Sequence, residues 1–145
     1  MDKQKNILII DDDADLIEAM KIILETKNYR IFTAYSPEEG FQMAKDVKPD
    51  LIILDVMFGS KERSLGFEYA VKMKLDKILA PIPILMSTAV NEAHSGFGFS
   101  PKTDGELLPV DDFINKPAQP DDLLKRIEKL LLQKISKWVN YPKKS

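Results

Sequence analysis

The chain has no cysteine, no long apolar run and no strong excess of charge of either sign. The lack of cysteine excludes disulfides, thiolate catalysis and zinc–thiolate sites, and it favours a reducing cytoplasm as the location. A formal net charge of −2 gives no electrostatic reason to expect nucleic acid or an anionic membrane as a direct partner. No apolar run approaches the roughly 18 residues of a membrane span, and the N-terminal apolar stretch is too short for a signal peptide.

The composition that remains is ordinary for a globular protein, with 44% apolar and 30% charged residues among 145. This length suits one domain with a sizeable core. We expect that domain to span residues 1–140, and we expect residues 141–145 to fray as a tail.

Short apolar runs alternate with longer helical patterns along the chain. The runs are mostly aliphatic, as in strands that are buried on both faces of a sheet. Strands alternating with helices indicate right-handed crossovers and a parallel sheet with helices on both faces, which is an α/β fold. The predicted strands are Ile7–Ile10, Tyr29–Tyr35, Leu51–Leu54, Ile82–Met86 and Phe113–Ile114.

Capping residues mark where the helices begin. Ser36, followed by proline and then by Glu39 at the third position, is typical of a helix N-terminus. Asp13 or Asp15 is available as the cap of the first helix.

The last helix begins at Pro120 and carries more apolar residues than one stripe requires. The stripe consists of Leu124, Ile127, Leu131, Ile135 and Trp138, and further leucines lie at Leu123, Leu130 and Leu132. These further leucines either belong to the core or form the seam of a homodimer.

Polar side chains follow the strands at their carboxyl ends, where open parallel sheets bind ligands. Asp11–Asp13 follow the first strand and Asp55 the third, whereas Ser87 and Thr88 follow the fourth and Lys116 the fifth. Carboxylates held this close repel each other unless a cation intervenes, and Mg²⁺ prefers carboxylates, waters and phosphate. Lysine and threonine can bind phosphoryl oxygens. An aspartate beside a cation can accept a phosphoryl group as an acyl phosphate.

Four stretches, in order, resemble the receiver domains of two-component response regulators: ILIIDD, PDLIILDVM, PILMSTA and DFINKP. The resemblance covers nearly the whole chain. It places the family's acidic pair at Asp11 and Asp12, its phosphoacceptor at Asp55, its hydroxyl residue at Thr88 and its lysine at Lys116. It also implies a flavodoxin-like, doubly wound sheet of five parallel strands in the order 2-1-3-4-5.

The resemblance implies the chemistry of the site. Asp55 would attack a phosphohistidine on a sensor histidine kinase or phosphotransfer protein, or a small phosphodonor. Mg²⁺ would be bound by Asp12, Asp55 and the backbone carbonyl of Met57, with Asp11 acting mainly through water.

The resemblance also implies a switch. Thr88 and Lys116 would engage the phosphoryl oxygens, and the switch aromatic Phe113, three residues before Lys116, would follow Thr88 inward. The Lys116–Pro117 bond is usually cis in the family. The chain would act as a stand-alone receiver that signals to a downstream target protein, not as an enzyme, and could form a homodimer through the last helix.

Two segments depart from the family pattern. The loop after Asp55 is longer than usual and lacks a proline, and Val90–Pro109 replaces the usual fourth helix with glycines and prolines that break a regular helix. The mode of output is therefore left open. Met57 and Val90 are apolar at positions that tune dephosphorylation in the family, which predicts a long-lived acyl phosphate.

Other functions fit the acidic run less well. Asp11, Asp13 and Asp15 mimic the start of an EF-hand loop, but the sixth and twelfth positions are Leu16 and Ile22 instead of Gly and Glu. The run also nearly matches the Asp-x-Asp-x-Thr/Val motif of phosphohydrolases that use an aspartyl phosphate, but Asp15 fails the last position.

A third alternative is an interaction module that binds its partner without phosphorylation, through the remodelled Val90–Pro109 segment. The acidic pair, Thr88 and Lys116 argue against this alternative, because a degenerate receiver commonly loses one of them.

Overall fold

The computed structural model describes residues 3–58, 65–89 and 110–140, without the side chains at 89 and 134–140. The expectations for the loop after Asp55, for Val90–Pro109 and for the tail at 141–145 lie outside these residues. The side chains of Ile135 and Trp138, which belong to the predicted apolar stripe, also lie outside the described part of the chain.

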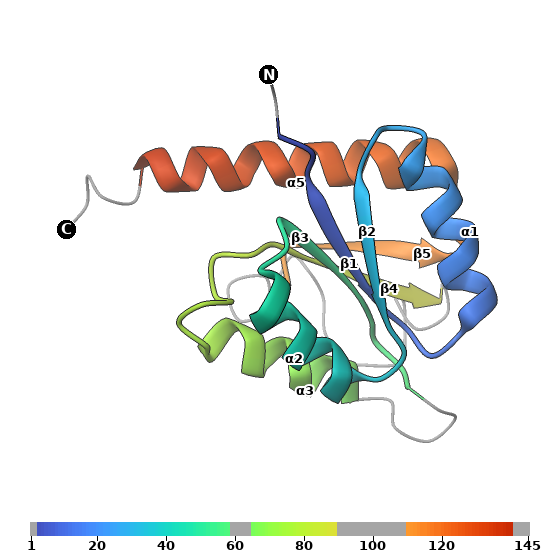
Figure 1. Cartoon of the computed structure of the whole chain (residues 1–145), viewed down its shortest axis with the longest axis horizontal. Coiled ribbons are helices and arrows are strands. Elements are labelled where there is room, and N and C mark those ends of the chain that lie inside the picture. Colours follow the sequence, from blue (N-terminus) through green and yellow to red (C-terminus); the bar gives the residue numbers. More distant parts are fainter. Residues whose placement is uncertain (1–2, 59–64, 90–109, 141–145) are drawn as a thin grey trace.

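The described chain is an α/β domain built on one parallel sheet (Figure 1). Its five strands lie in the order β2-β1-β3-β4-β5, and every neighbouring pair is parallel, which confirms the predicted fold and strand order. The elements are β1 Asn6–Ile10, α1 Ala14–Glu25, β2 Arg30–Ala34, α2 Pro37–Val47, β3 Leu51–Asp55, α3 Leu65–Leu75, β4 Ile84–Ala89, β5 Asp112–Lys116 and α5 Pro120–Asn140.

Local sequence explains where α1 and α2 begin. Ser36 Oγ accepts a hydrogen bond from the Glu39 N–H at 3.1 Å, so the predicted cap of α2 is confirmed. Asp13 caps α1, because its Oδ1 accepts hydrogen bonds from the Asp15 and Leu16 N–H groups at 3.0 and 3.1 Å. Lys48 ends α2 in the left-handed conformation with φ 53°.

The sheet has a hydrophobic core on each face. One cluster packs beneath α2 and α3 and includes Leu54, Met73 and Met86, whereas the other packs beneath α1 and α5 and includes Ile53, Leu24 and Ile127. Alternate residues of each strand join opposite clusters, as the two-residue period of a strand requires. Figure 1 shows α2 and α3 together on one side of the strands.

Three strands are longer at their carboxyl ends than the sequence predicted, and β3 is one of them because it includes Asp55. β4 begins at Ile84 and continues through Ser87 and Thr88, and β5 runs from Asp112 to Lys116. The predicted boundaries were wrong there, because the backbone ladder continues through residues whose side chains are polar. Asp55 and Lys116 are therefore the last residues of β3 and β5, and Thr88 is next to last in β4, so the sheet holds these three residues in register.

Helix α5 contributes Leu123, Ile127 and Leu130 to the core and extends past the sheet (Figure 1). Of the further leucines, Leu123 and Leu130 are buried, whereas Leu132 is 62% exposed. In the part of the chain that the structure describes, no helix combines the length and apolarity needed to cross a membrane.

Candidate functional site

Two carboxylates and one ammonium group meet at the carboxyl edge of the sheet. Asp11 follows β1, Asp55 is the last residue of β3, and Lys116 is the last residue of β5. Lys116 Nζ lies 2.7 Å from Asp55 Oδ1 and 3.3 Å from Asp11 Oδ2. Both carboxylates are essentially inaccessible, with 0% and 1% of Asp11 and Asp55 exposed. The sequence reasoning that placed these three residues on one edge is thus confirmed.

Burial controls the ionisation of this cluster. It raises the pKa of Asp55 from 3.8 to about 6, because pairing with Lys116 only partly offsets the loss of solvent and the charge of Asp11 adds to the effect. Burial also raises the pKa of Asp11, against the opposing effects of the Asp13 N–H and of Lys116. Burial alone would lower the pKa of Lys116, but its pairing with Asp55 and Asp11 raises it.

The carboxylates retain unused acceptor atoms. Apart from the ion pairs to Lys116, Asp11 Oδ2 and both Asp55 oxygens are buried without a hydrogen-bond partner in the described part of the chain. Unsatisfied buried oxygens of this kind are costly. One ligand oxygen each from Asp11, Asp12 and Asp55 can be chosen so that all lie within 4.8 Å of one another. An all-oxygen set that includes carboxylates fits a hard divalent cation such as Mg²⁺.

The acidic run after β1 divides into two roles. Asp11 is buried, and its Oδ1 accepts a hydrogen bond from the backbone N–H of Asp13 at 2.9 Å. Asp12 is exposed and lies with the cluster, whereas Asp13 caps α1 and Asp15 lies in its first turn. Negative charge in the first turn of a helix is favourable. The resemblance to an EF-hand therefore has no structural counterpart, because Asp13 is used as a helix cap.

Thr88 and Phe113 lie on neighbouring strands beside this cluster. Thr88 is 2% exposed near the end of β4, and Phe113 pairs in register with Met86, two residues earlier on that strand. Strand alternation puts Thr88 and Phe113 on the same face of the sheet, and Phe113 packs against the core cluster beneath α2 and α3. Met57, two residues after Asp55, is half-buried. The Lys116–Pro117 peptide bond is cis, as the resemblance implied.

Two residues near the site carried no role in the sequence prediction. Ser87 is a buried hydroxyl residue in register with Asp55, and its carbonyl accepts the Val56 N–H at 3.1 Å. Gly66, at the start of α3, packs so closely on β3 that a Cβ atom there would overlap the Asp55 carbonyl and lie 2.8 Å from Val56 Cα. Only a glycine in an otherwise helical pattern could have indicated this approach from sequence.

Comparison with known proteins gives one consistent result. The family model described as the response regulator receiver domain matches residues 7–128. The phosphate regulon transcriptional regulatory protein PhoB of Pseudomonas aeruginosa is 35% identical over 127 residues, which cover 88% of this chain and 52% of PhoB. The alkaline phosphatase synthesis transcriptional regulatory protein PhoP of Bacillus subtilis is 33% identical, with 88% and 48% covered. The chain thus spans about half the length of these curated relatives.

Solved structures agree in fold over nearly the same span. The chemotaxis protein CheY4 of Vibrio cholerae matches with a TM-score of 0.72 and 25% identity, covering 88% of this chain and 99% of that one. The signal receiver domain of a signal transduction histidine kinase from Syntrophus aciditrophicus matches with a TM-score of 0.70 and 27% identity, covering 89% and 91%.

Proposed function

The chain belongs to the response regulator receiver domain family, and from that premise we propose that Asp55 accepts a phosphoryl group and that the domain signals the change to a partner protein. Receiver domains are signalling domains, so the chemistry is limited to the domain's own phosphorylation and dephosphorylation. The observation that carries the proposal is the position of Asp55: its carboxylate is buried at the carboxyl edge of the sheet beside that of Asp11, and its Oδ1 lies 2.7 Å from the Lys116 ammonium group.

The proposed reaction is a phosphoryl transfer to a carboxylate oxygen. An oxygen of Asp55 attacks phosphorus, a P–O bond forms, and the P–N bond of a phosphohistidine breaks with its electron pair left on the imidazole nitrogen. With acetyl phosphate as donor, the broken bond is P–O and acetate leaves. Because Lys116 Nζ already lies 2.7 Å from Asp55 Oδ1, its positive charge is placed to stabilise charge on the phosphoryl oxygens.

Thr88 and Phe113 are proposed to convert this reaction into a change of shape. Thr88 lies near the end of the strand next to β3 and would donate its hydroxyl to a phosphoryl oxygen. Phe113 projects from the neighbouring strand on the same face and would follow Thr88 inward.

Mg²⁺ is the proposed cofactor, and it would supply charge neutralisation for the carboxylates and the incoming phosphate. The residues proposed to hold it are Asp12, Asp55 and the Met57 carbonyl, with Asp11 acting mainly through water. The buried carboxylates of Asp11 and Asp55 share the positive charge of Lys116, and this supports the assignment because a cation would offset the negative charge that remains.

The proposed phosphodonor is a sensor histidine kinase or a phosphotransfer protein, and the proposed location is the cytoplasm. The printed names of PhoB and PhoP describe transcriptional regulators, and this chain matches about half of each. A formal net charge of −2 gives no electrostatic reason for direct nucleic-acid or membrane binding by this domain, and we propose a downstream protein target. Exposed Leu132 on α5 leaves a homodimer through the last helix as a further proposal.

The test is incubation with acetyl phosphate and Mg²⁺, read by intact mass. One phosphoryl adduct is expected on the wild type, and none on Asp55→Asn. Asp55→Asn is the matched variant because asparagine keeps the shape of the buried side chain and removes the nucleophile. No adduct on the wild type, with the protein folded, would contradict the proposal and favour an interaction module that works without phosphorylation. Turnover of phosphate esters that is lost in Asp11→Asn but not in Asp55→Asn would instead favour a phosphohydrolase.

A further inference from the structure

Asp111, the residue before β5, binds both backbone polar groups of the first residue of β4. Its N–H donates to the Ile84 carbonyl at 2.9 Å, and its Oδ2 accepts a hydrogen bond from the Ile84 N–H at 2.8 Å. The same oxygen accepts a hydrogen bond from Lys74 Nζ of α3 at 3.0 Å. Asp111 is therefore joined to β4 at one defined position, and Lys74 holds its carboxylate there.

Lys74 is suited to hold this carboxylate in place. The side chains of Lys74 and Asp111 are only 27% and 15% exposed, so water screens the pair less than it screens a surface ion pair. Lys74 also donates to the Ala80 and Ile82 carbonyls at 3.4 and 3.1 Å. The position of its ammonium group is thus set by the backbone that leads into β4.

Burial does little to fix the register of strand β5. The strand lies at the edge of the five-stranded sheet, next to β4 alone, and of its five residues only Ile114 is buried. All five residues of β3 are buried by contrast. A strand in which few residues are buried has a weakly specified register. The polar contact at the start of β5 supplies the specificity that burial does not.

The pairing of β4 with both of its neighbours sets the distance between two residues of the candidate site. Ser87 of β4 is in register with Asp55 of β3. Ala89, two residues later, is in register with Lys116 of β5. A slip of β5 by one residue would turn Lys116 to the other face of the sheet, and a slip by two would move it by about 6–7 Å. Either slip would break the 2.7 Å contact between Lys116 Nζ and Asp55 Oδ1.

We propose that Asp111 is a positioning residue for phosphoryl transfer, because it fixes the register of β5 and so holds Lys116 against Asp55. Lys74 supports this role by orienting the Asp111 carboxylate. The inference rests on the proposed function and extends its site to the opposite edge of the sheet. Asp111 precedes the start of β5, whereas Lys116 ends that strand, so Asp111 acts through the strand and takes no part in the chemistry.

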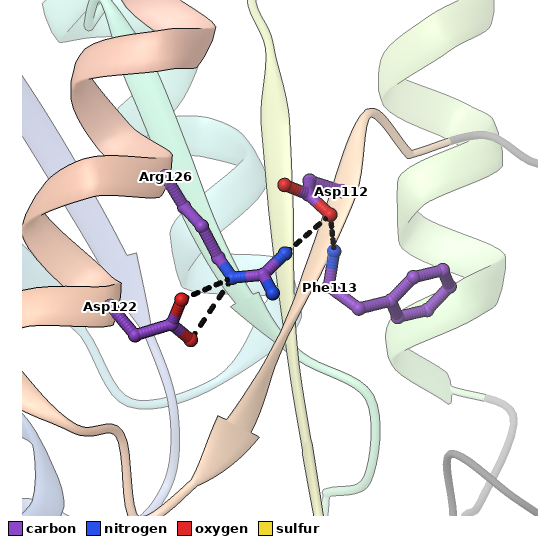
Figure 2. Close-up of polar contacts among 4 residues, drawn as sticks. All are labelled: Asp112, Phe113, Asp122 and Arg126. Carbon is purple, nitrogen blue, oxygen red and sulfur yellow. Dashed lines mark hydrogen bonds and ion pairs between the residues drawn. The ribbon is translucent and has the colours of Figure 1, made fainter.

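Asp112 provides the matched comparison, because it is also an aspartate at the start of β5 but has other partners. Its Oδ1 accepts hydrogen bonds from Arg126 of α5 at 2.9 Å and from the Phe113 N–H at 2.8 Å (Figure 2). The Asp112 side chain is therefore tied to α5 and to its own strand instead of β4. Its replacement should leave the register of β5 under the control of Asp111.

The position of Lys116 can be measured without any phosphodonor. In the wild type its Nζ contacts Asp55 and Asp11 and its side chain is 23% exposed, so trace acylation by acetic anhydride should be slow there. Peptide mass spectrometry gives the extent of acylation, with exposed Lys27 as the internal reference. Asp111→Ala should raise the ratio of Lys116 to Lys27 acylation by about threefold or more, because it frees an ammonium group held by charge-assisted hydrogen bonds.

The same variant should be a slower phosphoacceptor. With acetyl phosphate and Mg²⁺, the initial rate of adduct formation at Asp55, read by intact mass, should fall by about threefold or more. Asp111→Asn should lie between Asp111→Ala and the wild type in both measurements. Asparagine keeps an oxygen for the Ile84 N–H and removes only the charge that Lys74 binds. Asp111→Asn also provides the test if Asp111→Ala folds poorly.

Two controls separate positioning from a general loss of stability. Asp112→Asn changes the neighbouring aspartate. Ile7→Val removes a buried methyl group from β1, a strand that is not adjacent to β5. Both variants should keep the wild-type acylation ratio and phosphorylation rate, even though Ile7→Val lowers the urea midpoint.

The outcomes are distinguishable. A wild-type acylation ratio in Asp111→Ala overturns the inference, and so does a ratio raised equally in either control. An unchanged rate of adduct formation in Asp111→Ala overturns it too, while the adduct on the wild type leaves the proposed function standing. The absence of an adduct on the wild type contradicts the proposed function and the inference together.

Discussion

Gly66 should be required both for stability and for the position of the phosphoacceptor strand. A Cβ atom at this position would overlap the Asp55 carbonyl oxygen and approach Val56 Cα to 2.8 Å, and both atoms are backbone. Backbone cannot rotate away as a side chain can, so Gly66→Ala must displace the start of α3 from the end of β3. Overpacking of this kind costs about 1–3 kcal/mol, and the gain in helix propensity offsets at most about 1 kcal/mol.

We therefore expect Gly66→Ala to lower the free energy of unfolding by about 2 kcal/mol, which corresponds to a melting temperature lower by roughly 4–8 °C. Urea unfolding and thermal melting measure the loss. The rate of Asp55 phosphorylation by acetyl phosphate should also fall, because the displaced carbonyl belongs to the nucleophile itself.

Gly40→Ala is the matched control for this prediction. The nearest atoms that a Cβ atom there would meet belong to the Ile10 side chain, with Cγ1 and Cγ2 at 2.6 and 2.8 Å. Ile10 is fully buried, so Gly40→Ala should also lower the stability. None of these nearest atoms is backbone of Asp55, so the phosphorylation rate should be unchanged. If Gly66→Ala matches the wild type in both stability and rate, the close approach of α3 to Asp55 is not a constraint and the reasoning is wrong.

Three further predictions concern charge. The pKa of Asp55 is raised from 3.8 to about 6, so the folded state keeps this proton after the unfolded state has lost it. Without Mg²⁺, the stability of the wild type relative to Asp55→Asn should therefore fall as pH rises from about 4 to about 6, by at most about 3 kcal/mol. If the difference in urea midpoint between the wild type and Asp55→Asn is the same at about pH 4.5 and about pH 7.5, this prediction is wrong. Lys74→Gln, which removes donors to Asp111 and two carbonyls, should cost about 1–3 kcal/mol in urea unfolding, whereas exposed Lys77→Gln should change it by less than about 0.5 kcal/mol. Mg²⁺ at about 100 times its Kd should stabilise the wild type by about 2.7 kcal/mol, and a melting temperature indifferent to Mg²⁺ would count against the metal site.

The fold could be predicted because its determinants are local. Continuous aliphatic runs mark strands buried on both faces, and Ser36 marks a helix start through a hydrogen bond to a residue three positions away. The strand ends could not be predicted as well. Ser87 and Thr88 look like loop residues by polarity, yet Ser87 is fixed in β4 by its register with Asp55 on the neighbouring strand. Pairing of that kind depends on a strand more than 30 positions away in sequence.

The candidate site, like the fold, could be predicted from the sequence only in part. The residue types that gather at the edge of the sheet were predictable, because each follows or ends a recognisable strand. The partition of the acidic run was only partly predictable, since Asp13 and Asp15 were equal candidates for the cap and the structure uses Asp13. The contact between Arg126 and Asp112 has no short-range signature, because it joins residues 14 positions apart on a helix and a strand. Such contacts follow from packing, which a single sequence does not reveal.

The charge balance of the Asp11–Asp55–Lys116 cluster explains why this domain would retain buried charges that destabilise its fold. Asp11 and Asp55 contribute two negative charges when ionised and Lys116 contributes one positive charge, so the buried group carries a net charge of −1 before exposed Asp12 is counted. A hydrophobic replacement of similar shape would be at least as stable. The cluster instead contains a buried carboxylate whose negative charge Lys116 only partly neutralises. A divalent cation together with an incoming phosphoryl group would balance the remaining charge. The instability of the metal-free cluster and its proposed capacity to accept a phosphoryl group thus have the same physical origin.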